Sequence, residues 1–347
     1  MESARDYLIQ AADSGASDLF IAAGAFVSKK VGLELEPMSK EKLSAEDSAK
    51  LVTELYEMAS RPMKKLTESG DDDFSFAIAG KARFRVNAYK QRGSLAAVLR
   101  TVAFQIPDYQ SLDIPESVLE LADSPSGMVI VTGTAGSGKS TTQACIIDRI
   151  NRTKKRHIVT LEDPIEYLHK NELSIVSQRE IALDTVSYAS ALRACLRQAP
   201  DVIYLGEMRD AETIHTAMTA AETGHLVLGT LHTKGAANTV DRIIDAFPPD
   251  QQHQARVQLA MVLHTVVFQE LVPAAPRPVA AFEIMRATSG VRGLIRDGKT
   301  HQLDAAITQG IRDGMVPMDR ALEALVQSGR VSADDVKPLL SRQTQGR

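Results

Sequence analysis

An eight-residue segment near the middle of the chain has the composition of a phosphate-binding loop. Residues 133–140 read GTAGSGKS and match GxxxxGK[ST], with an apolar run before them and a helix-like run after them. Glycines let successive backbone N–H groups turn inward around phosphates, and the N-terminus of the following helix adds partial positive charge. We expect the phosphates to be bound by Gly133, Thr134, Ala135, Gly136, Ser137, Gly138, Lys139, Ser140 and Thr141.

Two side chains of this loop have the chemistry to act on a nucleotide. We expect Lys139 to reach the β and γ phosphates of ATP and the Ser140 hydroxyl to be a ligand of Mg²⁺. A glycine-rich turn for a dinucleotide is a weaker alternative, because a Lys–Ser pair has no role there. A glycine-rich turn without function is disfavoured because four positions and both flanks match. The loop therefore predicts binding of ATP with Mg²⁺.

A glutamate follows a short apolar strand further along the chain. The run DVIYLGE (201–207) places Glu207 just past the strand end. In a parallel sheet the carboxyl ends of the strands form the edge where nucleotides bind. A carboxylate there can polarise the attacking water or support the Mg²⁺ shell. The alternative is a solvated glutamate at the strand end, and it is weaker because the phosphate-binding loop lies upstream.

A second acidic group lies in TLEDPIE (160–166), again after an apolar run. Glu162, Asp163 and Glu166 are crowded, and carboxylates so close raise one another's pKa unless a cation lies nearby. We interpret them as a second group that positions Mg²⁺ or water. The alternative is an acidic loop that caps the N-terminus of a helix after Pro164.

Two histidines flank the apolar run LVLGTL (226–231), with His225 before it and His232 after it. On an extended strand they would lie on opposite faces and about 23 Å apart, so they cannot easily share a metal. His232, at the carboxyl end, is a candidate sensor of the γ-phosphate. A purely structural role stays open for each histidine.

Arginines gather in two parts of the chain. An ATPase that works as a ring needs arginines from a neighbouring domain or subunit to neutralise transition-state charge. A single surface arginine usually forms an ion pair that contributes little, so both interpretations stay open. The candidates are Arg83, Arg85, Arg92 and Arg100 in the first part, and Arg193 and Arg197, one helical turn apart, in the second.

The elements that must position these residues indicate an α/β fold. Apolar strands without polar alternation, typical of parallel sheets covered on both faces, are predicted at 128–133, 157–162, 201–207 and 225–232. Helix-like runs separate them, which predicts a doubly wound domain. Residues 234–347 are mostly helical in pattern, with breaks near 248–249, 273–278 and 310–317.

The first hundred residues have a different pattern. Helices are predicted at 2–13 and 44–59, the second capped by Ser44. Strands are predicted at 17–24, 73–79, 81–91 and 94–102, and a strand or hairpin at 29–38. This mixture predicts a small α+β domain over 1–104. A linker with two prolines follows over 105–115, and an ATPase domain covers 116–347.

Composition and charge exclude several classes of protein. The 347 residues are 44% hydrophobic and 24% charged, which is ordinary for a globular protein. No apolar run approaches the roughly 18 residues that span a bilayer, and the N-terminus lacks a secretory signal, so we expect a cytoplasmic protein. Forty basic and forty-four acidic residues disfavour general binding of nucleic acid. Cys145 and Cys195 form no CxxC pair and are predicted core residues, not zinc ligands.

A set of ordered motifs identifies a family. The chain resembles the secretion ATPase superfamily of type IV pili and type II secretion, and within it the pilus retraction ATPases. The resemblance covers nearly the whole chain and lies in ARFRVNAYKQRG (82–93), GTAGSGKST (133–141), TLEDPIEYLH (160–169), LRQAPDVIYLGEMRDAETI (196–214) and AAETGHLVLGTLHT (220–233).

The resemblance implies roles for the candidate residues. It implies that Glu207 is the catalytic glutamate, that Glu162 and Asp163 form the family's acidic box, and that His232 contacts the γ-phosphate. It also implies two groups of arginines, an intersubunit pair and a pair beside the nucleotide. These match Arg85 and Arg100, with Arg92 in the same stretch, and Arg193 and Arg197.

The resemblance further implies architecture and partners. Members join a PAS-like N-terminal domain to a RecA-like ATPase domain with C-terminal helices. They form homohexamers in the cytoplasm, at the inner face of the cytoplasmic membrane. There they act on a membrane-embedded pilus platform protein, with other pilus ATPases as further partners, and drive pilin subunits back into the membrane. We expect neither the extra N-terminal domain nor the four-cysteine zinc module of assembly-type relatives, which favours retraction.

One segment departs from the retraction pattern. GVRGLIRD (290–297) stands where retraction ATPases carry a segment like AIRNLIRE, and its two glycines are predicted to weaken a helix by roughly 1 kcal/mol each. We expect Val291, Leu294 and Ile295 to face inward and Arg292, Arg296 and Asp297 to face solvent or a partner. Two alternative functions remain: a related type II, conjugative or pilus-accessory ATPase, and a regulatory nucleotide binder without hydrolysis.

Overall fold

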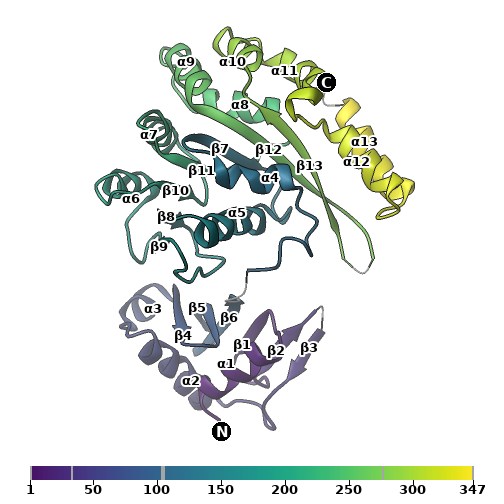
Figure 1. Cartoon of the computed structure of the whole chain (residues 1–347). Helices are drawn as coiled ribbons and strands as arrows, with labels where there is room; N and C mark the ends of the chain where they lie inside the picture. The colour runs from purple at the N-terminus through teal and green to yellow at the C-terminus, as the bar shows by residue number, and fades with distance from the viewer. Residues whose placement is uncertain (1, 33, 103–105, 276, 346–347) are drawn as a thin grey trace. The chain divides into compact units, whose positions relative to one another are not determined.

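The chain folds as two compact units, formed mainly by residues 1–105 and 106–347. The computed structural model describes residues 2–32, 34–102, 106–275 and 277–345 (Figure 1). Residues 103–105, where the predicted N-terminal domain meets the predicted linker, lie outside the described residues. The linker over 105–115 therefore stays a prediction.

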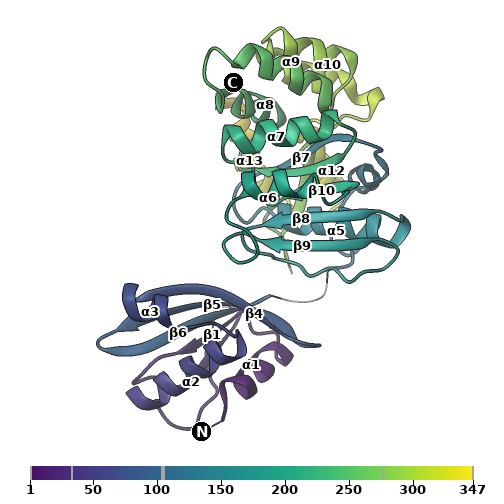
Figure 2. The ribbon, with the colours of Figure 1, turned by 90° about the vertical axis from the view of Figure 1, so that its left-hand side faces the viewer.

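The first unit is an antiparallel sheet with helices against it (Figure 2). Six strands pair in the order β3-β2-β1-β6-β5-β4. Its elements are α1 (Ala4–Asp13), β1 (Asp18–Ile21), β2 (Ser28–Val31), β3 (Glu34–Pro37), α2 (Ala45–Met58), α3 (Lys64–Ser69), β4 (Asp71–Ile78), β5 (Ala82–Gln91) and β6 (Ser94–Val102). The predicted strands and both predicted helices are present, and the short helix α3 is an addition.

Local sequence explains two of these elements. Ser44 caps α2 as predicted, because its hydroxyl accepts from the Asp47 backbone while the Asp47 carboxylate accepts from the Ser44 backbone. In β5, Phe84 and Val86 are buried whereas Arg85 is exposed, the alternation of a strand with one face against the core. The buried face packs with α1 and α2 into one core that also holds Leu55.

The second unit is a seven-stranded, mostly parallel sheet. The order is β13-β12-β7-β11-β10-β8-β9, and only β13 runs antiparallel to its neighbour. The strands are β7 (Gly127–Thr132), β8 (His157–Glu162), β9 (Ile175–Glu180), β10 (Val202–Leu205), β11 (Leu226–Leu231), β12 (Leu263–Val272) and β13 (Val279–Arg286). Strands β7, β8, β10 and β11 are those predicted, and the α/β class is confirmed.

Helices cover both faces of this sheet (Figures 1 and 2). One core packs side chains from α6 to α11 against it, and another packs α4 and α5 on the opposite face. The helices are α4 (Glu116–Leu119), α5 (Lys139–Thr153), α6 (Tyr188–Cys195), α7 (Ala211–Glu222), α8 (Ala236–Asp245), α9 (Gln252–Val262), α10 (Ser289–Arg296), α11 (Leu303–Gln309), α12 (Met318–Gln327) and α13 (Ala333–Gln345). This layering is that of a doubly wound domain.

The prediction of a mostly helical C-terminal part is wrong over residues 263–286. Strands β12 and β13 form a hairpin here, and the predicted break at 273–278 is its connection. The segment LHTVVFQELV is rich in β-branched residues, and β12 continues the parallel sheet beside β7. Sequence analysis also missed β9, because this edge strand has no continuous apolar run.

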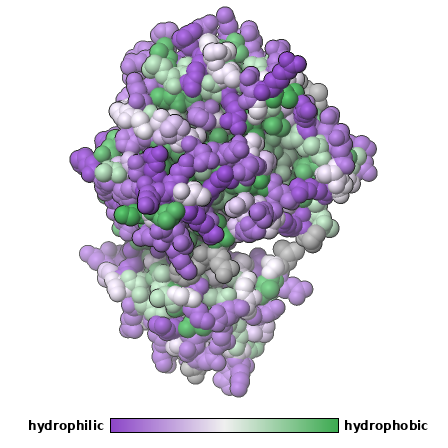
Figure 3. All heavy atoms as spheres, viewed as in Figure 1, coloured by the Kyte–Doolittle hydropathy of each residue, from purple (hydrophilic) through white to green (hydrophobic). Residues whose placement is uncertain are grey.

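Burial follows the apolar pattern. The visible surface carries mostly hydrophilic side chains with hydrophobic ones in small groups (Figure 3). Cys145 and Cys195 are buried, as predicted, and burial raises the pKa of their thiols to about 12 and about 11. Within the described ranges, no helix is both long and apolar enough to span a membrane.

Candidate active site

The segment 133–138 forms a tight loop between β7 and α5. A Cβ at Gly133 would lie 2.3 Å from the carbonyl oxygen of Gln269, so only glycine fits there. Gly138 has a positive φ of 86°, and its Cβ would lie 2.9 Å from the side-chain nitrogen of Gln269. The two glycines therefore let the loop backbone approach β12 closely before α5 begins.

Lys139, the first residue of α5, lies beneath the loop and is only 6% exposed. Its Nζ donates to the carbonyl oxygens of Gly133, at 2.9 Å, and Thr134, at 2.8 Å. The Ser137 hydroxyl oxygen is buried and has no hydrogen-bond partner in the described part of the chain. Ser140 and Thr141 are half-buried on the first turn of α5. A buried ammonium and an unpaired hydroxyl under glycine backbone make the loop fit for phosphate oxygens.

Gln269 supports this loop and was missed by sequence analysis. Its side chain is only 3% exposed, and its Oε1 accepts a hydrogen bond of 2.7 Å from the Thr142 hydroxyl on α5. The residue lies on β12, which the sequence pattern did not identify as a strand. The run of β-branched residues from Thr265 to Val267 was the signal that could have placed it.

A hollow of about 200 Å³ adjoins the loop on the side of β12. Its lining combines three segments: residues 112–114, the start of α5, and the β12–β13 hairpin. Thr141, Gln269 and Arg277 contribute polar groups, and Leu112, Ile114 and Val279 contribute apolar ones. An apolar hollow with a few polar groups beside a phosphate loop can hold the rest of a nucleotide.

Glu207 lies two residues beyond the end of β10, as predicted. Its Oε2 forms an ion pair of 2.6 Å with Arg209, and its Oε1 lies 3.5 Å from Nε2 of His232. Burial favours the neutral acid, but the hydrogen bond from Arg209 and the charges of His232, Arg209 and Lys139 outweigh it. The pKa of Glu207 is therefore lowered from its usual value. Sequence analysis did not single out Arg209, which is 71% exposed.

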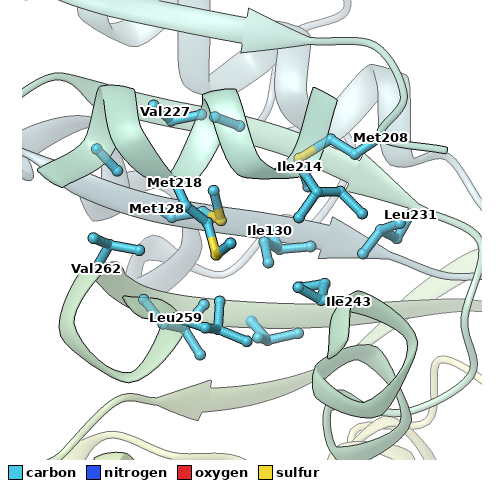
Figure 4. Close-up of a cluster of buried hydrophobic side chains, with 14 of the residues drawn as sticks. Met128, Ile130, Met208, Ile214, Met218, Val227, Leu231, Ile243, Leu259 and Val262 are labelled. Atoms are coloured by element: carbon cyan, nitrogen blue, oxygen red, sulfur yellow. The ribbon is translucent and has the colours of Figure 1, made fainter. Parts of the chain in front are cut away.

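Met208, the residue next to Glu207, is buried in the core. Met208 is 1% exposed, and its backbone N–H donates to Thr230 on β11 at 3.1 Å. Figure 4 shows Met208 beside Ile214 in the core between the sheet and the helices. A Cβ at Gly229 would lie 2.6 Å from the Met208 methyl carbon, so that glycine makes room for it. The buried Met208 thereby fixes the direction of Glu207.

The acidic box lies at the end of the neighbouring strand β8. Leu161 on β8 pairs with Leu205 on β10, so the residues that follow each strand lie side by side. Glu162 is buried and accepts hydrogen bonds from Thr160, at 2.6 Å, and Gln178, at 3.2 Å. Asp163 and Glu166 are exposed. The alternative of a capped helix after Pro164 is wrong, because residues 163–174 contain no helix.

The two histidines flank β11, as predicted. His232 follows the strand and is 46% exposed beside Glu207. Its neighbour Thr233 is tied to Thr132, the last residue of β7, by a backbone N–H donor at 3.0 Å. The Nδ1 atom of His225 lies 2.9 Å from the carbonyl oxygen of Ala220 near the end of α7. The structure thus places His232 at the candidate site and gives His225 a structural contact.

Two of the predicted arginines lie together in the first unit. Arg85 on β5 pairs in register with Arg100 on β6, and both side chains are exposed. Nε of Arg100 donates to Asp18 at 3.0 Å. These residues, with Asp73 and Asn87, line a hollow of about 320 Å³. The hollow thus holds two guanidinium groups beside the carboxylates of Asp18 and Asp73.

Two of the other predicted arginines make surface contacts. Arg193 on α6 forms an ion pair with Glu212, and Arg197 donates to the backbone oxygen of Arg193 at 3.2 Å. Arg92 has a positive φ of 47° in the turn between β5 and β6. The roles of Arg193 and Arg197 beside the nucleotide, and of Arg92 between subunits, stay predictions.

The segment 290–297 forms a helix despite its glycines. Thr288 caps α10, and Val291 and Ile295 are buried as predicted. The expectation that Arg292 faces solvent is wrong. Its Nη1 donates to the carbonyl oxygens of Ala260 and Met261 at the end of α9. Arg296 is 59% exposed, as expected.

The fold and the site define a P-loop ATPase. A mostly parallel sheet carries a GxxxxGKS loop after β7, and Glu207 follows β10 at the same edge of the sheet. The family model "Type II/IV secretion system protein" matches residues 3–327, and the chain belongs to that family.

Relatives and solved structures agree with this family. The chain is 41% identical over 333 residues to the "Type IV pilus retractation ATPase PilT" of Pseudomonas aeruginosa, and the match covers 96% of each protein. A crystal structure of "the Pilus Retraction Motor PilT and Bound ADP" is similar with a TM-score of 0.89 and 42% identity, covering 96% of both chains. The Legionella pneumophila ATPase DotB is similar at a TM-score of 0.84 and 29% identity, covering 98% of this chain and 96% of that one.

Proposed function

We propose that this protein hydrolyses ATP to power retraction of a type IV pilus, and thereby twitching motility. The observation that carries the proposal is the similarity to a pilus retraction motor over 96% of both chains. It is supported by a complete set of hydrolytic groups in the second unit. Lys139 lies in the phosphate loop, and Glu207 lies at the same edge of the sheet beside His232.

Different residues carry out different parts of the proposed hydrolysis. The backbone N–H groups of residues 133–141 and the ammonium of Lys139 bind the phosphates. Glu207, ionised because its pKa is lowered, orients the attacking water and accepts its proton. His232 senses the γ-phosphate, and Glu162 and Asp163 position further water. The hollow beside Gln269 takes the base and ribose.

Ser140 is the proposed protein ligand of Mg²⁺. It lies on the first turn of α5, next to the buried Lys139. In the described ranges no group of three His, Cys, Asp or Glu side chains could hold a metal ion by itself. The cation therefore depends on the bound phosphates, on water and on the Ser140 hydroxyl. When bound, Mg²⁺ neutralises the charge that develops on the phosphates.

The arginines motivate a proposal for assembly. Arg85 and Arg100 are exposed in the first unit, while the phosphate loop belongs to the second. We infer a homohexamer in which this pair acts on the nucleotide of a neighbouring subunit, with Arg193 and Arg197 acting beside their own. The domains are a PAS-like one over 1–104 and a RecA-like one over 116–347. The partners are an inner-membrane pilus platform protein, at the cytoplasmic face of the membrane, and other pilus ATPases.

A strain that lacks its own copy of this gene tests the proposal. Parental protein should restore twitching, and the purified chain should release phosphate from ATP. Lys139→Ala should abolish both, because the ammonium contacts the phosphates directly. Twitching without phosphate release would identify a regulatory nucleotide binder. Phosphate release with twitching unaffected by the gene, but with a defect in protein secretion, would identify a secretion ATPase.

A further inference from the structure

Tyr188 was not among the residues that the sequence pattern singled out. It is the first residue of α6, which begins after the N-cap Ser187. Its side chain is half-buried and packs at the edge of the core between α6 and the sheet. That position brings a phenol to the carboxyl edge of β8 and β10, where the acids of the site lie.

The contacts of Gly206 locate the hydroxyl group. The backbone N–H of Gly206 donates to the carbonyl oxygen of Leu161 at 2.8 Å, which joins the chain before Glu207 to the chain before Glu162. A Cβ at Gly206 would lie 3.1 Å from the hydroxyl oxygen of Tyr188 and 3.3 Å from Cα of Glu162. The hydroxyl therefore lies over the junction of the two acidic segments.

The surroundings of this hydroxyl keep it protonated. Burial raises the pKa of Tyr188, and the charges of Asp163, Glu162 and Glu207 raise it further. In the described part of the chain the hydroxyl makes no hydrogen bond with another residue. A phenol that stays protonated among carboxylates offers its O–H to whatever acceptor enters between them.

We propose that Tyr188 is a positioning residue that donates a hydrogen bond to the attacking water, which Glu207 orients, during hydrolysis. The inference rests on the proposed hydrolytic function. Glu207 accepts the proton of the attacking water, and the Tyr188 hydroxyl holds the oxygen of that water in line. No bond forms at the phenol, and its proton stays on it.

A purely structural role for Tyr188 would give a different result. The ring contributes to the core edge, and phenylalanine provides the same ring without the hydroxyl. Because the hydroxyl has no partner in the described chain, Tyr188→Phe removes no hydrogen bond of the fold. A positioning role affects turnover, whereas a packing role affects the thermal midpoint.

Steady-state phosphate release by the full-length protein, with ATP and Mg²⁺, tests the role. We expect Tyr188→Phe to lower kcat about 10-fold, the loss expected for one hydrogen bond to a reacting group, with KM for ATP and the thermal midpoint unchanged. Tyr204→Phe is the matched control. Tyr204 is buried on β10, in the core on the opposite face of the sheet, and its variant should keep the parental kcat.

Four outcomes would overturn the inference. A parental kcat in Tyr188→Phe, or a loss of kcat that follows a fall in thermal midpoint, would exclude the positioning role. Either result would leave the proposed hydrolysis standing. A rise in KM with kcat unchanged would assign the hydroxyl to ground-state binding instead. A parent protein that releases no phosphate would overturn the proposed hydrolysis, and the role of Tyr188 with it.

Discussion

Glu207 and His232 lie 3.5 Å apart, between Oε1 and Nε2, although 24 residues separate them in the chain. Each follows a strand of the parallel sheet, Glu207 after β10 and His232 after β11, and these two strands are neighbours. The pair therefore joins the proposed catalytic base to the residue expected at the γ-phosphate. A change at the phosphate can reach both residues at once.

The first prediction concerns the hydrolytic step. Glu207→Gln should keep nucleotide binding and lose turnover by a factor on the order of 10²–10⁴, because an amide cannot accept the proton of the attacking water. Binding of a fluorescent ATP analogue and phosphate release measure the two effects separately. Glu222→Gln is the control, since Glu222 is exposed on α7, away from the phosphate loop in sequence, and accepts a hydrogen bond from Gln258. Parental turnover in Glu207→Gln would show that this glutamate is not the base.

The second prediction concerns the exposed arginines of the first unit. If Arg100 acts on a neighbour's nucleotide, Arg100→Ala and Lys139→Ala chains should each be inactive, yet an equimolar mixture should regain activity. Random rings contain about one quarter of interfaces with both groups intact, so recovery should approach that share of parental activity. Phosphate release after mixing measures it. If the mixture recovers no activity, and the specific activity of the parent protein does not depend on its concentration, each monomer is self-sufficient.

The third prediction concerns α10, whose exposed Arg296 we propose passes the change at the phosphate to a partner surface. It separates this coupling role from a role in stability. Arg296 is exposed, and its surface ion pair with Asp297, at 3.7 Å, contributes little to stability. Arg296→Ala should therefore leave phosphate release within about twofold. The same variant should abolish twitching if Arg296 acts on the partner. Arg292→Ala is the contrasting variant. It removes two hydrogen bonds at the end of α9 and should lower stability by about 1–3 kcal/mol. Normal twitching in Arg296→Ala, or a joint fall of stability and hydrolysis, would contradict the coupling role.

The fourth prediction concerns pH and a buried carboxylate of the first unit. Asp72 is 1% exposed, and it accepts two hydrogen bonds of 2.9 Å from Arg61 and one of 3.1 Å from Tyr56. Burial opposes its charge, but the bonds from Arg61 and Lys65 outweigh burial and lower the pKa of Asp72. Its ionised form therefore stabilises the folded state above the unfolded pKa, near 3.9, and this stabilisation is lost as pH falls through the lower folded pKa.

Asp72→Asn should consequently destabilise the first unit by about 1–2 kcal/mol at neutral pH, a moderate value because Arg61 and Lys65 are partly solvated. The difference from the parent should vanish at acidic pH, where Asp72 itself becomes protonated. Calorimetric thermal midpoints of both proteins at several pH values measure it. A difference that stays constant down to pH 3 would show that packing, not charge, is responsible.

Much of the candidate site could be predicted from sequence because its groups sit in local patterns. The loop 133–141 carries its own glycines, Lys139 and Ser140, and the strand before it and the helix after it are short-range features. Glu207 and Glu162 could be placed because each follows an apolar strand, and parallel strands end at one edge. These inferences need only the spacing of neighbouring residues.

The remaining contacts were decided by tertiary structure. Gln269 supports the loop from a strand more than 120 residues away, and Tyr188 reaches the acids only because α6 packs beside β8 and β10. Arg292, expected to face solvent or a partner, instead donates to the end of α9, because α10 packs beside α9. Side chains such as these have no local signature, because their partners are set by which strands and helices become neighbours. The sequence by itself determined the phosphate chemistry and the class of fold, since backbone geometry and apolar spacing act over a few residues. Which side chains surround that chemistry depends on packing between distant segments, and packing is resolved only when the whole core forms.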